Sequence, residues 1–72
     1  MNQTKKELFI ASCSSNEGAK LFVRVVVLPS GQKEVITTTD VKGQTEYIKG
    51  AYNDNMELSA NPKIKIEGWI FA

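Results

Sequence analysis

The sequence contains no histidine, and its 72 residues include one cysteine, Cys13. A chain without histidine lacks the usual general base near neutral pH and offers no imidazole to a metal ion. A single thiol forms neither a disulfide within the chain nor a thiolate zinc site, and the sequence places no activating base beside it. We therefore predict a non-enzymatic protein without cofactor or metal, in which Cys13 is a structural residue of a strand.

Phosphate-binding and calcium-binding motifs are missing as well. The five glycines are scattered along the chain, so they form no glycine-rich loop that could cradle a phosphate. Asp54 and Glu57 lie among asparagines, but this segment has neither the glycine nor the spacing of acids that a calcium loop requires. A polar loop that ends a helix is the simpler interpretation.

Long apolar runs and an excess of one charge are also absent. No stretch approaches the ~20 apolar residues of a membrane-spanning helix. Nine Lys and Arg against eight Asp and Glu give a net charge of +1, whereas dedicated nucleic-acid binders usually carry a clear basic excess. We expect one domain over residues 1–72, with residues 1–6 as a disordered N-terminal tail, in the reducing environment of the cytoplasm.

One segment favours another location. Leu8–Asn16 follows two lysines and resembles a bacterial lipoprotein signal, in which a small residue precedes the lipidated cysteine. Its apolar core, residues 8–11, is shorter than the about 7–15 residues of such a signal, and Glu7 lies directly before it. The other interpretation of these residues is a first strand over 7–13 with alternating faces, and the fold prediction uses it.

The clearest structural signal is a hairpin. Two β-rich segments, 20–28 and 33–39, flank the turn 29–32, in which Pro29 presets φ and Gly31 tolerates a positive φ. The first segment is apolar on both faces, which is typical of a central strand, whereas the second is more polar, as an edge strand is. The first segment carries Leu21, Val23, Val25 and Val27 on one face and Phe22, Val26 and Leu28 on the other, interrupted by Arg24.

The pattern changes to a helical period after Asp40, a good N-cap residue. Apolar side chains recur at helical spacing from Val41 to Tyr52, and the helix is expected to end within the turn-forming residues 53–55. After an Asn-Pro break, residues 63–71 alternate as a strand. In that strand one face is expected to hold Ile64, Ile66 and Ile70, and the other Lys63, Lys65, Glu67, Trp69 and Phe71.

Together these segments predict an α+β fold with the order β-β-β-α-β. The first three strands form an antiparallel meander. A right-handed crossover through the helix then lays the last strand parallel to its neighbour, beside the first strand. The expected architecture is a small four-stranded mixed sheet, in the order 4-1-2-3 when strands are numbered along the chain, with one helix packed on one face.

One helix covers one sheet face, so the second face is expected to stand open. It would carry Phe22, Val26, Leu28, Trp69 and Phe71, or the equivalent set if the registers are inverted. An exposed apolar patch of several hundred Å² marks an interaction site, and Trp and Phe are favoured at binding hot spots. The alternative is a second small core, closed by strong coiling of the sheet or by the loop 54–62.

These observations predict a small protein–protein interaction module. We expect an accessory, regulatory or inhibitory protein of the kind that bacteria and phages encode, which docks through the open face or through a strand edge at 37–39. Its partner would be another protein or, as a homodimer, a second copy. The expected partner-binding residues are Phe22, Arg24, Trp69 and Phe71.

A sheet-based nucleic-acid-binding protein is the alternative function. A three-stranded sheet followed by a helix resembles the DNA-reading sheet domains of integrase amino-terminal regions, whose strands enter a groove; this resemblance is one of topology and rests on no motif. Basic side chains would contact phosphates, and aromatic residues of the last strand would stack on single-stranded bases. The candidate contacts are Lys20, Lys33, Lys63 and Lys65.

Overall fold

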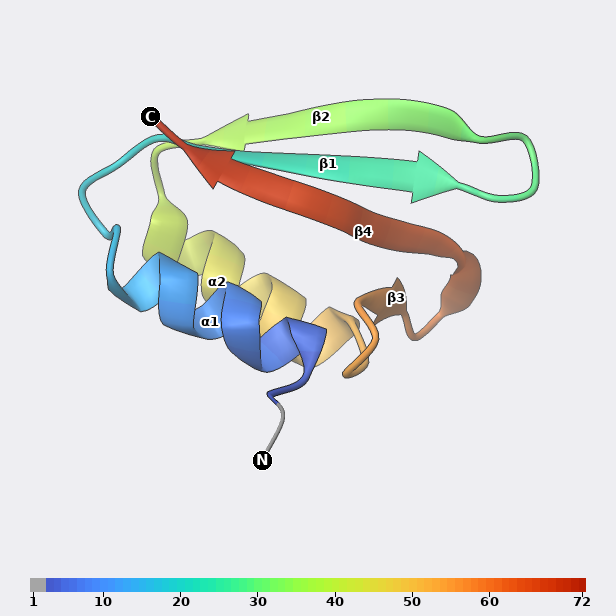
Figure 1. Ribbon diagram of the computed structural model, residues 1–72, viewed down its shortest axis with the longest axis horizontal. Coiled ribbons are helices and arrows are strands. Elements are labelled where there is room, and N and C mark those ends of the chain that lie inside the picture. The colour runs from blue at the N-terminus through green and yellow to red at the C-terminus, as the bar shows by residue number, and fades with distance from the viewer. Residues whose placement is uncertain (1–2) are drawn as a thin grey trace.

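The computed structural model describes residues 3–72, and within them the chain forms two layers, a sheet and a pair of helices on one of its faces (Figure 1). The elements follow in the order α1 (Lys5–Ser14), β1 (Leu21–Val27), β2 (Gln32–Thr38), α2 (Val41–Ala51), β3 (Glu57–Leu58) and β4 (Asn61–Phe71). The predicted α+β class is therefore confirmed, with three long strands, a two-residue β3 and one helix more than expected.

The sheet has the order β2-β1-β4-β3, and each neighbouring pair is antiparallel. The predicted hairpin is confirmed, with Val27 in register with Gln32 and a positive φ of 77° at Gly31 in the turn. The predicted mixed sheet is wrong: β4 lies antiparallel beside β1, because the segment that was expected between them is not a strand. β4 also begins at Asn61, where the sequence suggested a break.

α1 occupies the residues for which a strand over 7–13 was predicted. Its N-cap is Thr4, whose hydroxyl accepts a hydrogen bond from the Glu7 amide at 3.1 Å, while the Glu7 carboxylate accepts one from the Thr4 amide at 2.9 Å. This capping box satisfies two amides that the first turn of a helix leaves unpaired. The predicted tail over 1–6 is accordingly too long, since the helix begins at Lys5; residues 1 and 2 lie outside the described residues.

α2 follows the prediction closely. Asp40 is its N-cap, and the carboxylate accepts a hydrogen bond from the Gly43 amide at 3.0 Å. Val41 and Ile48 are buried at helical spacing, and the helix ends before the turn-forming residues, with Tyr52 at its C-cap. Residues 53–56 then turn back and place Met56 in the core.

β4 carries a β-bulge that alternation alone does not reveal. Two adjacent residues of β1, Arg24 and Val25, face residues of β4 that are two positions apart, so Glu67 is an extra residue between them. The bulge shifts the alternation by one residue. In register with the inward face of β1 are Ile64, Ile66, Trp69 and Phe71, whereas Lys65 and Ile70 are in register with its outward face. The predicted grouping of Trp69 and Phe71 with the lysines, and of Ile70 with the other isoleucines, is therefore wrong.

The hydrophobic core lies between the helices and the inward face of the sheet. β1 contributes most to it, as expected of a central strand, and the two helices close it from below in the view of Figure 1. The buried core residues are Phe9, Cys13, Leu21, Val23, Val25, Val41, Ile48, Tyr52, Met56 and Ile66. Because the 53–56 turn packs on this same side, it does not cover the outward face of the sheet.

Candidate functional site on the open sheet face

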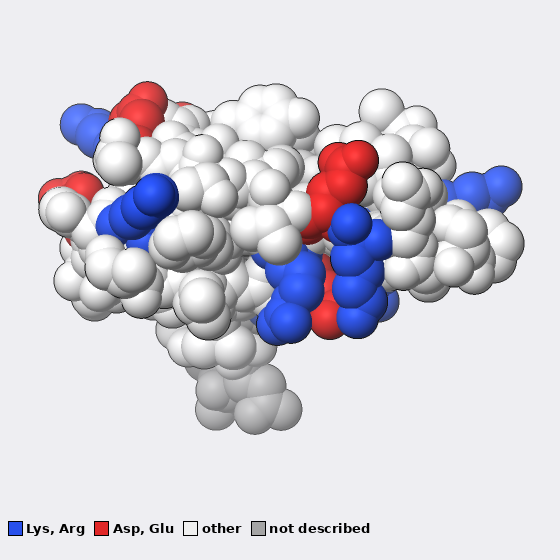
Figure 2. Space-filling model, turned by 90° about the horizontal axis from the view of Figure 1, so that it is seen from above, with Lys and Arg blue, Asp and Glu red and all other residues white. Residues whose placement is uncertain are grey.

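The sheet face opposite the helices, here called the open face, is not covered by any of the elements that the structure describes (Figure 1). Figure 2 looks down on it: uncharged atoms cover most of the surface, and charged side chains gather in a band across it. By register and alternation, the open face holds Phe22, Arg24 and Val26 of β1, Lys33, Val35 and Thr37 of β2, and Lys63, Lys65 and Ile70 of β4.

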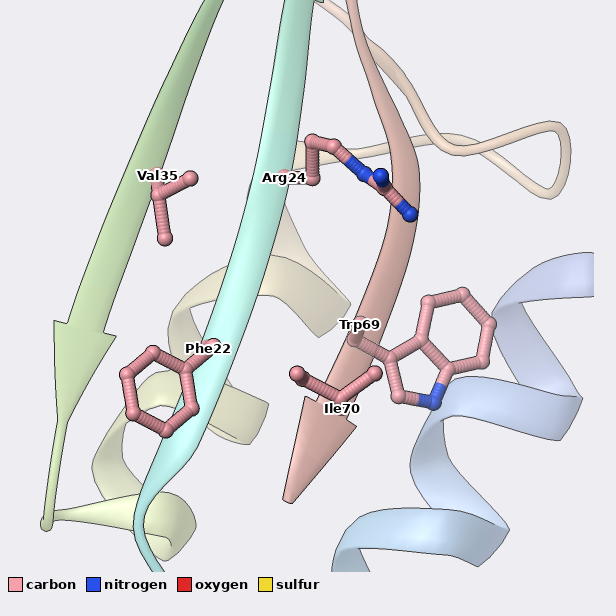
Figure 3. A pocket seen from close by; sticks show the side chains of 5 residues that line it. All are labelled: Phe22, Arg24, Val35, Trp69 and Ile70. Atoms are coloured by element: carbon pink, nitrogen blue, oxygen red, sulfur yellow. The ribbon is translucent and has the colours of Figure 1, made fainter. Parts of the chain in front are cut away.

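A shallow apolar hollow of about 300 Å³ lies at one end of the open face (Figure 3). It is lined by Phe22, Arg24, Val35, Trp69 and Ile70, which come from all three long strands. Val35 is 60% exposed and Ile70 is 63% exposed, which is unusual for β-branched apolar side chains in a sheet. The hollow is therefore an apolar surface without a cover in the described chain.

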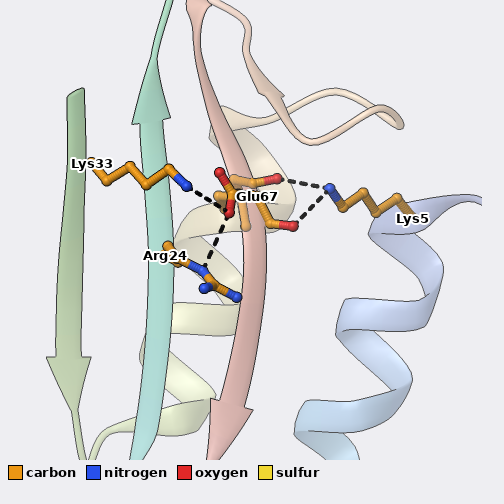
Figure 4. A network of polar contacts seen from close by, with 5 residues as sticks. Lys5, Arg24, Lys33 and Glu67 are labelled. Carbon is orange, nitrogen blue, oxygen red and sulfur yellow. Dashed lines mark hydrogen bonds and ion pairs between the residues drawn. The ribbon is translucent and has the colours of Figure 1, made fainter. Parts of the chain in front are cut away.

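Charged side chains form a cluster beside the hollow, over the bulge (Figure 4). The Glu67 carboxylate lies 3.6 Å from Arg24 Nε and 3.4 Å from Lys33 Nζ. These pairs are solvent-exposed, so each contributes at most about 1 kcal/mol to stability. Their structural effect is to hold the Arg24 guanidinium at the rim of the hollow.

The bulge itself is fixed from the other layer. Lys5 of α1 donates hydrogen bonds from Nζ to the backbone carbonyls of Ile66, at 3.0 Å, and Glu67, at 3.2 Å (Figure 4). A bulge leaves backbone groups outside the regular ladder, and the ammonium group supplies donors to two of them. The first turn of α1 thereby helps to set which side chains of β4 reach the open face.

The structure brings together some of the predicted partner-binding residues and separates others. Phe22 and Arg24 both line the hollow. Trp69 lines its edge, but the indole also packs edge-to-face on the buried Phe9 ring, with 5.0 Å between the ring centroids. Phe71 packs against the core on the helix side, so it does not reach the open face. Val26, which was also expected on this face, is there but is buried.

Two residues of the hollow escaped the sequence-based prediction. Ile70 was placed on the opposite face, since the extra residue at the bulge is invisible to a strict two-residue period. Val35 lies in a strand that was recognised as an edge, and its exposure is the property that an edge strand implies. Gly68, next to Glu67, is the one signal that could have indicated a bulge, since glycine within a strand often marks one.

The predicted basic residues are spread over the molecule. Lys33, Lys63 and Lys65 belong to the open face, at the end nearer the β1–β2 turn. Lys20 precedes β1, and its ammonium group lies 5.5 Å from the centroid of the Phe22 ring. Lys20 and Arg24 therefore place positive charge on two sides of the apolar hollow.

Cys13 lies on the opposite side of the molecule, in the core between the helices. Burial raises the pKa of its thiol, and a hydrogen bond with the Thr45 side chain opposes this in part. The thiol is therefore neutral near pH 7, and a neutral thiol is a poor nucleophile. The described residues contain no cluster of three or more potential metal ligands, and neither helix is long and apolar enough to cross a bilayer.

Comparisons of the chain with protein-family models, with curated proteins and with solved structures gave no match. The open face is therefore the feature of the molecule from which a function is inferred.

Proposed function

We propose that the protein is a small non-enzymatic interaction module that docks another protein on its open face. The observation that supports this most strongly is the hollow, in which the exposed Val35 and Ile70 lie on either side of the half-buried Phe22. Keeping such side chains in water forgoes about 25 cal/mol for each Å² of apolar surface that could be buried. A partner that covers the hollow would recover this free energy.

The rim of the hollow indicates the chemistry of the partner. Arg24 and Lys20 flank the apolar floor with positive charge, and Arg24 is more than half exposed. A matching surface presents an apolar or aromatic side chain with a carboxylate close to it. In this arrangement Phe22, Ile70 and Trp69 provide the apolar contact and Arg24 orients the partner, as arginine and aromatic residues commonly do at hot spots. Accessory, regulatory or inhibitory proteins of bacteria and phages act through docking of this kind.

The test is capture of a partner with tagged protein from a lysate of the source cells, with and without nuclease treatment. Wild type is expected to retain one protein in stoichiometric amount from both halves, and Ile70→Asp to lose it. Leu8→Asp is the matched control, because Leu8 is also exposed, at 46%, but lies on α1 outside the hollow. Retention by Ile70→Asp, or loss by both variants, would contradict docking at the hollow.

Nucleic-acid binding is the second candidate function. What favours it is that Arg24, Lys33, Lys63 and Lys65 all belong to the open face, although Glu67 lies between two of these cations. Binding to phosphates releases counterions and weakens steeply with salt. A single-stranded oligonucleotide should then bind tightly at low salt and be lost from the double variant Lys63→Glu/Lys65→Glu. Binding that persists unchanged at high salt would rule out this mode.

A further inference from the structure

β2 is an edge strand, and none of the residues described by the structure forms a layer over either of its faces. Within the described chain it pairs with β1 alone, and six of its seven residues are exposed. Val35 is 60% exposed on the open face, and Ile36, on the helix side, is 39% exposed because the helices pack mainly on β1 and β4. Proteins usually protect such an edge with proline, a bulge, a covering loop or charged side chains, and of these devices the strand Gln32–Thr38 has only the charges of Lys33 and Glu34.

The pairing of β1 with its two neighbours shows which residues of β2 direct their backbone N–H and C=O groups away from the sheet. The amide of Leu28 donates to Lys63 of β4, and Lys20 exchanges two backbone hydrogen bonds with Ala72 at the other end of β1. Because backbone groups alternate along a strand, the even-numbered residues of β1 bond to β4 and the odd-numbered ones to β2.

The residues of β2 in register with the odd-numbered set therefore direct their N–H and C=O groups toward β1. These are Gln32, Glu34, Ile36 and Thr38. The residues between them direct theirs away from the sheet, so the outer edge presents the amides and carbonyls of Lys33, Val35 and Thr37.

This outward-directed set is symmetric about Val35, and we propose that a second copy of the chain pairs there, antiparallel, edge to edge. With the two-fold axis at Val35, this residue lies opposite its own copy and Lys33 lies opposite Thr37 of the second copy. Each of these three pairs exchanges two backbone hydrogen bonds, the pattern of an antiparallel ladder. This register also pairs the whole of Gln32–Thr38, the longest overlap that the strand allows.

The side-chain pairs that this register creates across the interface are favourable or neutral. The two Val35 side chains meet on the open face, where β-branched cross-strand pairs stabilise sheets. Glu34 lies opposite Ile36 of the second copy on the helix side, and no two like charges lie directly opposite each other. A second copy satisfies this edge by symmetry, as isologous interfaces do, whereas a strand from another protein would need its own matching sequence. The pairing also brings the two hollows together, because Val35 lines each of them.

The proposal is tested by sedimentation equilibrium of the purified chain and of two charge variants. Wild type should sediment as a dimer of the 8.0 kDa chain, and Val35→Lys as a monomer, because two ammonium groups would then face each other at the two-fold axis. Val35→Glu should also weaken the dimer, but less, since each glutamate lies diagonally beside Lys33 of the second copy. An equimolar mixture of the two variants should restore a dimer, because lysine then faces glutamate.

Two matched controls keep the test specific. Val35→Thr retains a β-branched side chain without charge and should remain dimeric, and Ile70→Asp should remain dimeric while losing docking at the hollow. Dimerisation through β2 and docking at the hollow are thus measured separately, so the failure of one is distinguishable from the failure of the other. A wild type that stays monomeric up to about 1 mM would overturn it and leave the edge to a strand of another protein. A dimer unaffected by Val35→Lys, or a mixture that does not associate, would also overturn it.

Discussion

β1 and β2 are the two arms of one hairpin and have the same length, yet they differ in burial and in the number of neighbouring strands. In β1, four of seven residues are buried, and the strand has a neighbour on each side and both helices beneath it. In β2 none is buried, and the strand has one neighbour within residues 3–72. Both arms carry adjacent β-branched residues. The difference teaches that the burial of a residue depends on the position of its strand in the sheet, and that one arm and one face stay exposed among the described residues.

The difference in burial between the two arms is tested most directly by truncating one apolar side chain in each arm to alanine. Leu21→Ala should lower the free energy of unfolding by about 3 kcal/mol, because Leu21 is fully buried. Val35→Ala should change it by about 0.5 kcal/mol or less. Urea unfolding at low protein concentration measures both values. Equal losses would mean that β2 is packed as firmly as β1.

The two sides of β4 offer a comparison between neighbouring residues. Trp69→Ala should cost about 2 kcal/mol of stability, less than for a fully buried aromatic residue, since the indole packs on Phe9 but is partly exposed. Ile70→Ala, one residue away on the open face, should be close to neutral. Thermal unfolding followed by circular dichroism checks the pair. A Trp69→Ala protein of unchanged stability would show that the indole acts only as a surface contact.

Thiol labelling compares the core with the exposed arm directly. Cys13 should react with a disulfide reagent at least about 10-fold more slowly in the folded protein than in urea, because reaction requires opening of the core. In the variant Val35→Cys, which carries two thiols, one fast and one slow phase are expected from absorbance kinetics. A single fast phase for both would contradict the burial of Cys13.

The smallest effect is expected at the first turn of α1, where the hydrogen bond from the Thr4 backbone, and then that from its hydroxyl, lowers the pKa of Glu7. A carboxyl whose pKa is lower in the folded than in the unfolded state stabilises the fold above its unfolded pKa, and this contribution is lost as the pH falls through the folded value. The stability difference between wild type and Glu7→Gln should therefore shrink on acidification below about pH 4. A difference that does not change with pH would contradict this account.

The sequence allowed prediction of the elements that local chemistry decides. The turn at Gly31, the N-cap at Asp40 and the central position of β1 in the sheet each follow from residue types and their spacing, and each is confirmed. The first helix was missed because Leu8–Cys13 alternates as well as a strand does. The overlooked signal was Thr4 followed three residues later by Glu7, the signature of a capping box.

The residues of the candidate site were predicted only in part, because β1 is regular whereas β4 contains a bulge. Phe22 and Arg24 were placed on the open face because β1 is regular over its whole length. Trp69, Phe71 and Ile70 were assigned to the wrong faces, since one extra residue in β4 reverses the alternation for everything after it. That residue is stabilised by Lys5, which is 61 positions away from Ile66 in the chain, and no local pattern reports such a contact.

The bulge gives β4 one residue more than its register with β1 requires. An in-frame loss of the Glu67 codon would remove that residue and leave every other amino acid unchanged. Gly68 would then follow Ile66 directly, so Trp69, Ile70 and Phe71 would stay opposite their present partners in β1 and keep their faces. The deletion would nevertheless remove the carboxylate that lies between Arg24 and Lys33, and one of the two carbonyls that Lys5 binds. A single deleted codon would thus change the charge of the open face without moving its apolar side chains.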